Sequence, residues 1–194
     1  MSQQPMKPPL FPGPLGLGSR PVPARTLAEL LGIPEKRKIF VSYHHDLDQA
    51  YYDALARMVD DFEFLQDRSV DRLIGSDDPE YQERRIREKY IKGTSATIVL
   101  CGAQTYQRKF VDWEIYATLD KDGGLIGIAL PTATTTREGI IVPPRLHENI
   151  QSGYALWRHW IHLTGPNLRA WIEEAVKKDK ALIRNSSDKK PRNG

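Results

Sequence analysis

Two largely apolar runs set the strongest limit on what this chain can fold into. They are "TSATIVLCGA" at 94–103 and "LIGIAL" at 125–130, and a helical pattern that ends at glycine separates them at 108–124. Strands without regular polar positions are typical of parallel sheets, because crossover helices cover both faces of such sheets. The sequence therefore predicts an α/β fold around a central parallel sheet.

The rest of the body fits the same alternation of strand and helix. Apolar residues recur at helical spacing after Asp46, and cap residues with many charges predict a mostly solvated helix that ends at Gly93. We read 131–153 as a long loop. The predicted strands are 38–43, 62–66, 94–103, 125–130 and 154–161, and the predicted helices are 46–62, 76–93, 108–124 and 165–183.

Composition divides the chain into three parts. Eight of the fourteen prolines fall in residues 1–34, so residues 1–37 predict a Pro/Gly-rich arm whose only regular element is a short helix at 26–34. Residues 38–183 form the predicted domain. The lysines and arginines after it predict a basic disordered tail at 184–194.

The net charge of +3 is unevenly distributed. Residues 177–194 carry +5 and residues 1–37 carry +3, which leaves −5 on the segment 38–176. A nucleic-acid-binding protein needs a basic patch on its folded part, and here that part is acidic. We therefore expect no nucleic-acid partner.

Several other classes are disfavoured. No apolar run reaches the roughly 18 residues that a membrane span needs, and no signal peptide is visible, so we expect a cytoplasmic protein without a membrane partner. A single cysteine, Cys101, excludes an internal disulfide and a cysteine zinc site. His159 and His162 have no carboxylate at ligand spacing, so we expect no metal site.

The stretch "KIFVSYHHDLD" at 38–48 runs from a buried strand directly into histidines and aspartates. In parallel sheets ligands bind beyond the carboxyl ends of the strands, where these residues lie. Two further segments should reach the same edge, "SVDRLIGSDD" at 69–78 and "CGAQTYQRKFVDWE" at 101–114. The sequence thus predicts a pocket built from three strand ends.

Glu114 is the strongest single candidate for chemistry in this pocket. It lies early in its helix between large apolar neighbours, which should desolvate the carboxylate and raise its pKa, whereas the helix N-terminus acts in the opposite direction. The alternative is an ordinary helical glutamate that faces water.

Three stretches resemble the TIR-like domains of the bacterial antiviral Thoeris system. They are "RKIFVSYHHD", "TSATIVLCGAQTYQRKFVDWEI" and "GLIGIAL", and the closing "NLRAWIEEA" helix adds to the likeness. The second stretch is the most specific, since it combines the apolar strand, the "QTY", the basic pair and an aromatic residue before Glu-Ile. The resemblance covers about 38–131 and leaves out the arm and the loop 131–153.

The resemblance implies a flavodoxin-like three-layer fold and an enzyme that cleaves NAD between nicotinamide and ribose. It implies that NAD is a substrate and that no cofactor is needed. The product would be an ADP-ribose-derived signalling nucleotide, either a cyclic isomer or a conjugate, that activates a separate antiviral effector. Self-association through TIR domains and activation by a phage component are further implications.

The family's catalytic glutamate falls on Glu114, and its strand-end aromatic and histidine fall on Tyr43 and His44. A carboxylate suits the chemistry, because breaking an N-glycosidic bond builds positive charge on the ribose. Trp113 or Tyr43 would stack on a ring, and Arg108 would balance the diphosphate. The predicted substrate-binding residues are Ser42, Tyr43, His44, Asp77, Arg108 and Trp113.

Two other functions stay open from the sequence. A TIR domain that only assembles with other TIR domains would need no activity, although such scaffolds often lack the glutamate. A nucleoside deoxyribosyltransferase-like enzyme shares the architecture and also uses a carboxylate on ribose. The identity of the product, the trigger, the oligomeric state and the role of the arm do not follow from the sequence.

Overall fold

The computed structural model describes residues 36–66, 86–191 and 193. The chain divides into two units, Met1–Glu35 and Lys36–Gly194, and every described residue lies in the second. The predicted helix at 26–34, the first part of the predicted helix at 76–93, and Asp77 therefore lie outside the described residues.

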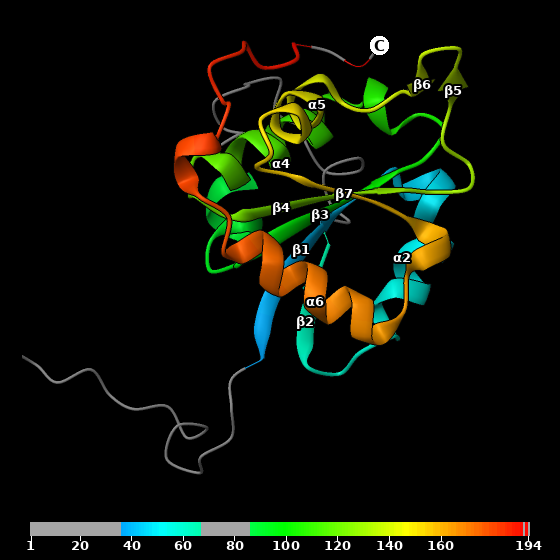
Figure 1. Cartoon of the computed structure of the whole chain (residues 1–194), viewed down its shortest axis with the longest axis vertical. Coiled ribbons are helices and arrows are strands. Elements are labelled where there is room, and N and C mark those ends of the chain that lie inside the picture. The colour runs from blue at the N-terminus through cyan, green and yellow to red at the C-terminus, as the bar shows by residue number, and fades with distance from the viewer. Residues whose placement is uncertain (1–35, 67–85, 192, 194) are drawn as a thin grey trace, which may run out of the picture. The chain divides into compact units, whose positions relative to one another are not determined.

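A five-stranded parallel sheet forms the centre of the fold (Figure 1), in the order β2-β1-β3-β4-β7. In order of their position along the chain, its strands run 2-1-3-4-5, which is the flavodoxin-like arrangement. Its strands are β1 Arg37–Ser42, β2 Phe62–Leu65, β3 Ala96–Cys101, β4 Gly124–Ala129 and β7 Leu156–His159. All five predicted strands are thus confirmed, with ends that differ by a few residues.

Helices cover both faces of this sheet. The helices α2 (His45–Ala56) and α6 (Gly165–Val176) contribute Leu55 and Leu168 to one apolar cluster. On the other face lie α4 (Lys109–Leu119), α5 (Pro144–Gln151) and the π-helical turn η1 (Ile86–Ile91), which supply two further clusters. Figure 1 shows α4 and α5 above the strands β3 and β4, and α6 and α2 below them. The predicted three-layer α/β fold is confirmed.

Three predicted helices are shorter than expected. The helix predicted at 46–62 is α2, which ends at Ala56. The helix predicted at 108–124 is α4, which ends at Leu119 and is preceded by a 3-10 turn, Thr105–Gln107. The final helix begins as predicted, where the Thr164 side chain accepts a hydrogen bond from the Asn167 N–H at 3.3 Å. It ends at Val176, and a 3-10 turn follows at Lys180–Leu182.

The segment 131–153 contains regular structure, contrary to the loop that we predicted. A small antiparallel hairpin pairs β5 (Thr135–Thr136) with β6 (Gly139–Ile140), and α5 follows with proline at its start. The apolar periodicity of the sequence did not indicate this helix, because two of its three buried side chains are the polar residues Arg145 and Asn149.

The C-terminal residues 184–191 and 193 lie along α4 and α5, whereas the sequence predicted a disordered tail. Their main chain bonds to buried side chains of both helices: the Lys190 N–H donates to Asp112 at 2.8 Å, and the Arg184 N–H donates to Asn149 at 3.0 Å. We call residues 184–191 and 193 the C-terminal strap. Its partners are polar residues inside the domain, which charge counting along the tail does not reveal.

Within the described part of the chain, no helix is long and apolar enough to cross a membrane, and no cluster of three or more His, Cys, Asp or Glu side chains is placed to hold a metal ion.

Candidate functional site

Alternation along β1 decides which predicted residues share a face. Tyr43 belongs to the apolar cluster under α2 and α6, as does Val41. Phe40 belongs to the opposite cluster, together with Trp113 of α4. Successive side chains of a strand point to opposite faces, so Ser42 lies on the same face as Phe40, which is the face that α4 covers.

The register of β3 places Glu114 close to Ser42. The Thr118 and Thr97 hydroxyls are 2.6 Å apart, and Thr118 also bonds to the carbonyl of Glu114 at 2.8 Å. Glu114 lies one helical turn nearer the carboxyl edge of the sheet, because a crossover helix runs antiparallel to the strands. That turn spans nearly the same length as two strand residues, so we infer that Glu114 lies near the level of Val99, whose register partner is Ser42.

Glu114 is buried, with 5 % of its surface exposed. The alternative of a glutamate that faces water is therefore wrong. The helix α4 presents Val111 and Ile115 to the sheet, and Glu114 sits between this apolar stripe and the side that faces η1. The sequence had already predicted that large apolar side chains lie next to Glu114.

Three buried polar atoms gather at the carboxyl end of β1. They are Ser42 Oγ, His44 Nδ1 and Asp48 Oδ1, and none of them has a hydrogen-bond partner among the described residues. Their residues are 5 % exposed or less. Buried polar groups are nearly always paired in folded proteins, so three such atoms at one sheet edge indicate a place where a polar ligand binds.

Asp48 was missing from the sequence prediction. It is fully buried on α2, and its Oδ2 accepts a 3.5 Å hydrogen bond from the Thr105 hydroxyl beyond β3. Burial raises the pKa of the Asp48 carboxyl, and the nearby His44 and the hydrogen bonds offset this only in part. Asp48 precedes Tyr52 by four residues and Leu55 by seven, and both of these are buried on the same helix. This helical spacing could have indicated that Asp48 is buried too.

The end of β3 is shaped to receive this carboxylate. A Cβ atom at Gly102 would lie 2.4 Å from both oxygens of Asp48, so only glycine fits there. The Gly102 N–H donates to the Thr105 hydroxyl at 2.9 Å. The neighbouring Cys101 is completely buried, and burial raises the pKa of its thiol, which is typical of an unreactive structural cysteine.

Tyr43 lies on the other face of the sheet from Glu114. Its ring stacks on Tyr52 with centroids 5.1 Å apart, and its hydroxyl contacts the side-chain amides of Gln49 and Gln66. His45 packs against the same ring, so only one of the two histidines, His44, has its side chain buried at the strand end. Strand alternation assigns Ser42 to the α4 side of the sheet, His44 is buried directly after the strand, and Tyr43 lies in the core on the other face.

Trp113 and Arg108 contact other parts of the domain. The Trp113 ring is buried in the cluster with Phe40, and its indole N–H donates to the Lys190 carbonyl at 2.9 Å. Arg108 lines a pocket of about 300 Å³ between α4, α5 and the C-terminal strap. Asp77 lies outside the described residues, so its predicted role stays a prediction.

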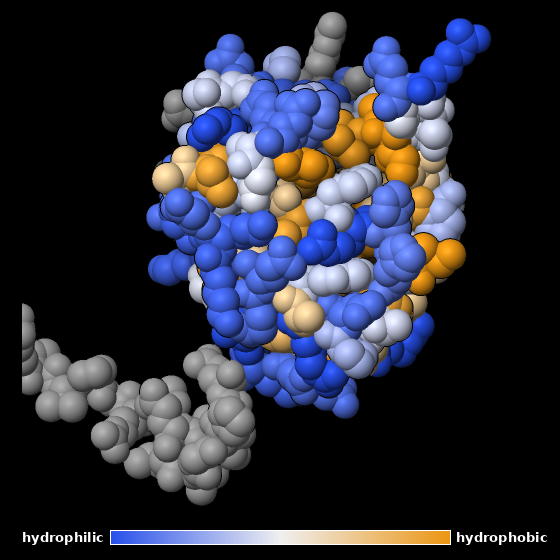
Figure 2. Space-filling model, viewed as in Figure 1, coloured by the Kyte–Doolittle hydropathy of each residue, from blue (hydrophilic) through white to orange (hydrophobic). Residues whose placement is uncertain are grey.

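A second pocket, of about 410 Å³, lies near the end of β7. Its lining includes Ile140, Ile150, Trp157 and His159. Figure 2 shows apolar side chains in this region, between α5 and the β5–β6 hairpin, while the surface over α6 is mostly hydrophilic. This pocket contains none of the predicted site residues.

The comparison with known families follows the same part of the fold. Residues 40–135 match the family described as Thoeris protein ThsB, TIR-like domain. The match runs from β1 to β5 and includes Ser42, His44, Asp48 and Glu114. No curated protein matches the chain. The resemblance predicted from the sequence is confirmed, and residues 40–135 form a TIR-like domain of the Thoeris ThsB family.

Proposed function

We propose that this protein cleaves NAD at the bond between nicotinamide and ribose, with Glu114 as the catalytic carboxylate. The observation that supports this most is the pair of buried polar atoms of Ser42 and His44 at the end of β1, which have no partners in the described structure, on the edge toward which the buried Glu114 of α4 lies. A ribose or a diphosphate would supply partners for those atoms.

The chemistry needs one carboxylate. When the C1′–N1 bond breaks, its electron pair moves to the pyridinium nitrogen and nicotinamide leaves as a neutral molecule, so no strong general acid is required. Positive charge develops on the ribose, and the Glu114 carboxylate stabilises it. Water then forms ADP-ribose and releases a proton, whereas a nucleophile on the adenine, the ribose or a second molecule forms a ring or a conjugate.

The buried polar atoms have separate roles in this proposal. The Ser42 hydroxyl and the unpaired nitrogen of His44 bind ribose hydroxyls or phosphate oxygens, and His44 accepts a proton when a ring closes. The product acts as a signal for a separate antiviral effector, and a phage component triggers the reaction. Self-association of TIR-like domains completes the proposed scheme.

The decisive experiment incubates the purified protein with NAD, with and without lysate from phage-infected cells, and analyses the nucleotides by mass spectrometry. Wild type should release nicotinamide, and Glu114→Ala and Glu114→Gln should not. Glu138→Gln, which changes an exposed glutamate on the β5–β6 hairpin, is the matched control.

If wild type leaves NAD untouched under all conditions, the proposal fails. Turnover of deoxynucleosides would then select the deoxyribosyltransferase-like function, and inactivity on both substrates would favour assembly alone.

A further inference from the structure

The C-terminal strap contacts the helix that carries Glu114 immediately before that residue. The Lys190 N–H donates to Asp112 at 2.8 Å, and the Lys190 carbonyl accepts from the Trp113 indole at 2.9 Å. The side chain of Asn193 accepts from the Lys109 N–H at 2.9 Å. The strap thus holds the first turn and a half of α4, and Glu114 follows directly.

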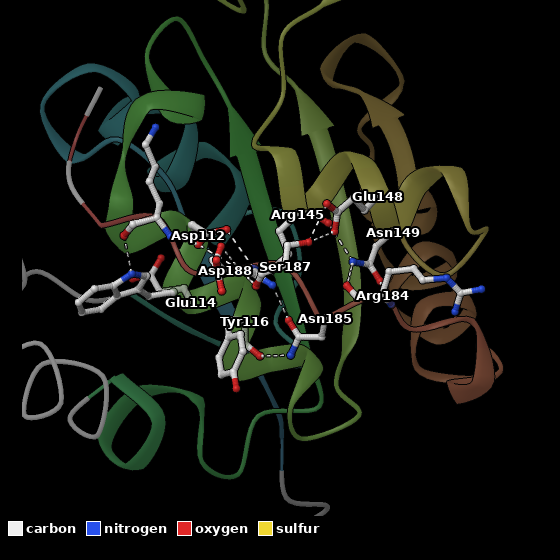
Figure 3. A network of polar contacts seen from close by, with 12 residues as sticks. Asp112, Glu114, Tyr116, Arg145, Glu148, Asn149, Arg184, Asn185, Ser187 and Asp188 are labelled. Carbon is white, nitrogen blue, oxygen red and sulfur yellow. Dashed lines mark hydrogen bonds and ion pairs between the residues drawn. The ribbon is translucent and has the colours of Figure 1, made fainter.

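Arg145 of α5 is the centre of this contact (Figure 3), and its side chain is 1 % exposed. It forms a two-point ion pair with Asp112, at 3.0 and 3.4 Å. Its Nη1 donates to the Asn185 side chain at 2.9 Å, and Nη2, which also contacts Asp112, donates to the Ser187 and Asp188 carbonyls at 3.0 and 3.1 Å. A buried guanidinium needs all of these acceptors, so helix α4 and the strap depend on each other through Arg145.

Asn149 and Asn185 fix the position of the strap along the helices. The buried Asn149 amide accepts from the Arg184 N–H at 3.0 Å and donates to the Arg184 carbonyl at 2.7 Å. Asn185 also donates to the Tyr116 carbonyl of α4 at 3.2 Å. Paired bonds of this kind define one register, since a shift of the strap by one residue would break them.

The start of α4 needs outside support. Its N-cap residue, Arg108, provides no side-chain hydrogen bond to the helix, and α4 has only eleven residues. The first N–H groups of a helix have no partner within it, and an uncapped first turn frays. The strap supplies such a partner through Asn193, and it anchors Asp112 and Trp113 at the same time.

We propose that the C-terminal strap positions Glu114 for the reaction, so that Asp112, Arg145, Asn185 and Asn193 are positioning residues of the candidate site. This inference rests on the proposed NAD-cleaving function. The strap touches the outer side of α4, opposite to the face that Glu114 shares with Ser42, so its effect passes through the orientation of the helix. Loss of the strap contacts should therefore lower kcat while KM for NAD changes little.

The test compares four full-length variants. Asn185→Ala removes the bonds to Arg145 and Tyr116, and Asn193→Ala removes the bond to the first turn of α4. Asn193→Asp keeps an acceptor for the Lys109 N–H and should restore activity. Ser186→Ala alters an exposed strap residue and is the matched control. We expect kcat to fall between about tenfold and a hundredfold for the two alanine changes at asparagine, with KM within about twofold.

A second readout does not depend on catalysis. The indole N–H resonance of Trp113, assigned with Trp113→Phe, reports the bond to the Lys190 carbonyl by NMR. Asn185→Ala should shift or broaden it, and Ser186→Ala should leave it unchanged.

A wild-type protein without NAD cleavage would refute the proposed function, whereas the indole signal would still show the docked strap. Unchanged kcat in Asn185→Ala and Asn193→Ala, or an equal loss in Ser186→Ala, would overturn the positioning role in an active enzyme.

Discussion

Replacement of Asp48 by asparagine should stabilise the protein at neutral pH. Asp48 is fully buried, one of its oxygens has no partner among the described residues, and burial raises the pKa of its carboxyl above the ordinary value of 3.8. A raised pKa in the folded state means that the protonated form is favoured by folding. The contribution of Asp48 to the free energy of unfolding is fully present below pH 3.8, where the carboxyl is protonated, and it is lost as the pH rises through the folded-state pKa.

Asparagine has nearly the same shape as aspartic acid and does not ionise. Each unit by which the folded-state pKa exceeds the unfolded value corresponds to about 1.4 kcal/mol at high pH. Asp48→Asn removes the cost of burying a charged group, which is larger than the roughly 1 kcal/mol cost of a neutral one, so we expect a gain of about 1–3 kcal/mol at pH 7. For a chain of this size that gain raises Tm by roughly 2–4 °C per kcal/mol.

The assay is urea denaturation of wild type and Asp48→Asn at several pH values between 4 and 8. The difference in free energy of unfolding should be small at pH 4, grow with pH and then become constant. Asp46→Asn, an exposed change in the first turn of the same helix, is the matched control and should show no such growth. A difference that is the same at every pH, or a destabilised variant at pH 7, would refute the reasoning.

Three further changes test neighbouring parts of the site. Gly102→Ala should lower the free energy of unfolding by about 1–3 kcal/mol, because the new Cβ overlaps the Asp48 carboxylate. In urea denaturation, the same change should cost less in a protein that also carries Asp48→Ala. Asp112→Asn should cost about 3–5 kcal/mol, since it leaves the buried Arg145 without its counter-ion, and a loss below about 1 kcal/mol in the same assay would contradict the role of this pair. Ser42→Ala removes a buried hydroxyl without a partner, so the free energy of unfolding should stay equal or rise by about 1 kcal/mol, while NAD cleavage should fall. Lower stability would show that the hydroxyl is bonded in the folded protein.

The sheet could be predicted from the sequence because its strands are short apolar runs bounded by helical patterns. The position of Glu114 near the carboxyl edge followed from the same pattern, since a crossover helix must return along the strand before it. The face of each β1 residue was also implied by alternation. Tyr43 was nevertheless assigned to the pocket from the resemblance, although it differs by one position from Ser42 and His44 and therefore points into the opposite layer.

The remaining parts could not be predicted because polar residues occupy buried positions. Helix α5 has Arg145 and Asn149 on its buried side, so the apolar periodicity of that segment was too weak to indicate a helix. Asp48 occupies a buried position of α2 in the same way. The C-terminal strap consists of polar and charged residues whose partners are these buried groups. Such contacts depend on pairs far apart in the chain, for example Asp112 with Lys190, and no local pattern encodes them.

Helix α4 connects the two polar regions of this domain. Asp112 and Glu114 are two residues apart, which places their side chains about 200° from each other around the helix. One side therefore binds Arg145 and the strap, while the other lies over the strand end where Ser42 and His44 have unpaired polar atoms. The strap bonds hold α4 from the side of Asp112, so in the proposed reaction the helix is fixed from the side away from the substrate. In the proposed reaction the Glu114 carboxylate would benefit from this arrangement, because a fixed helix needs no reorientation when charge develops on the ribose.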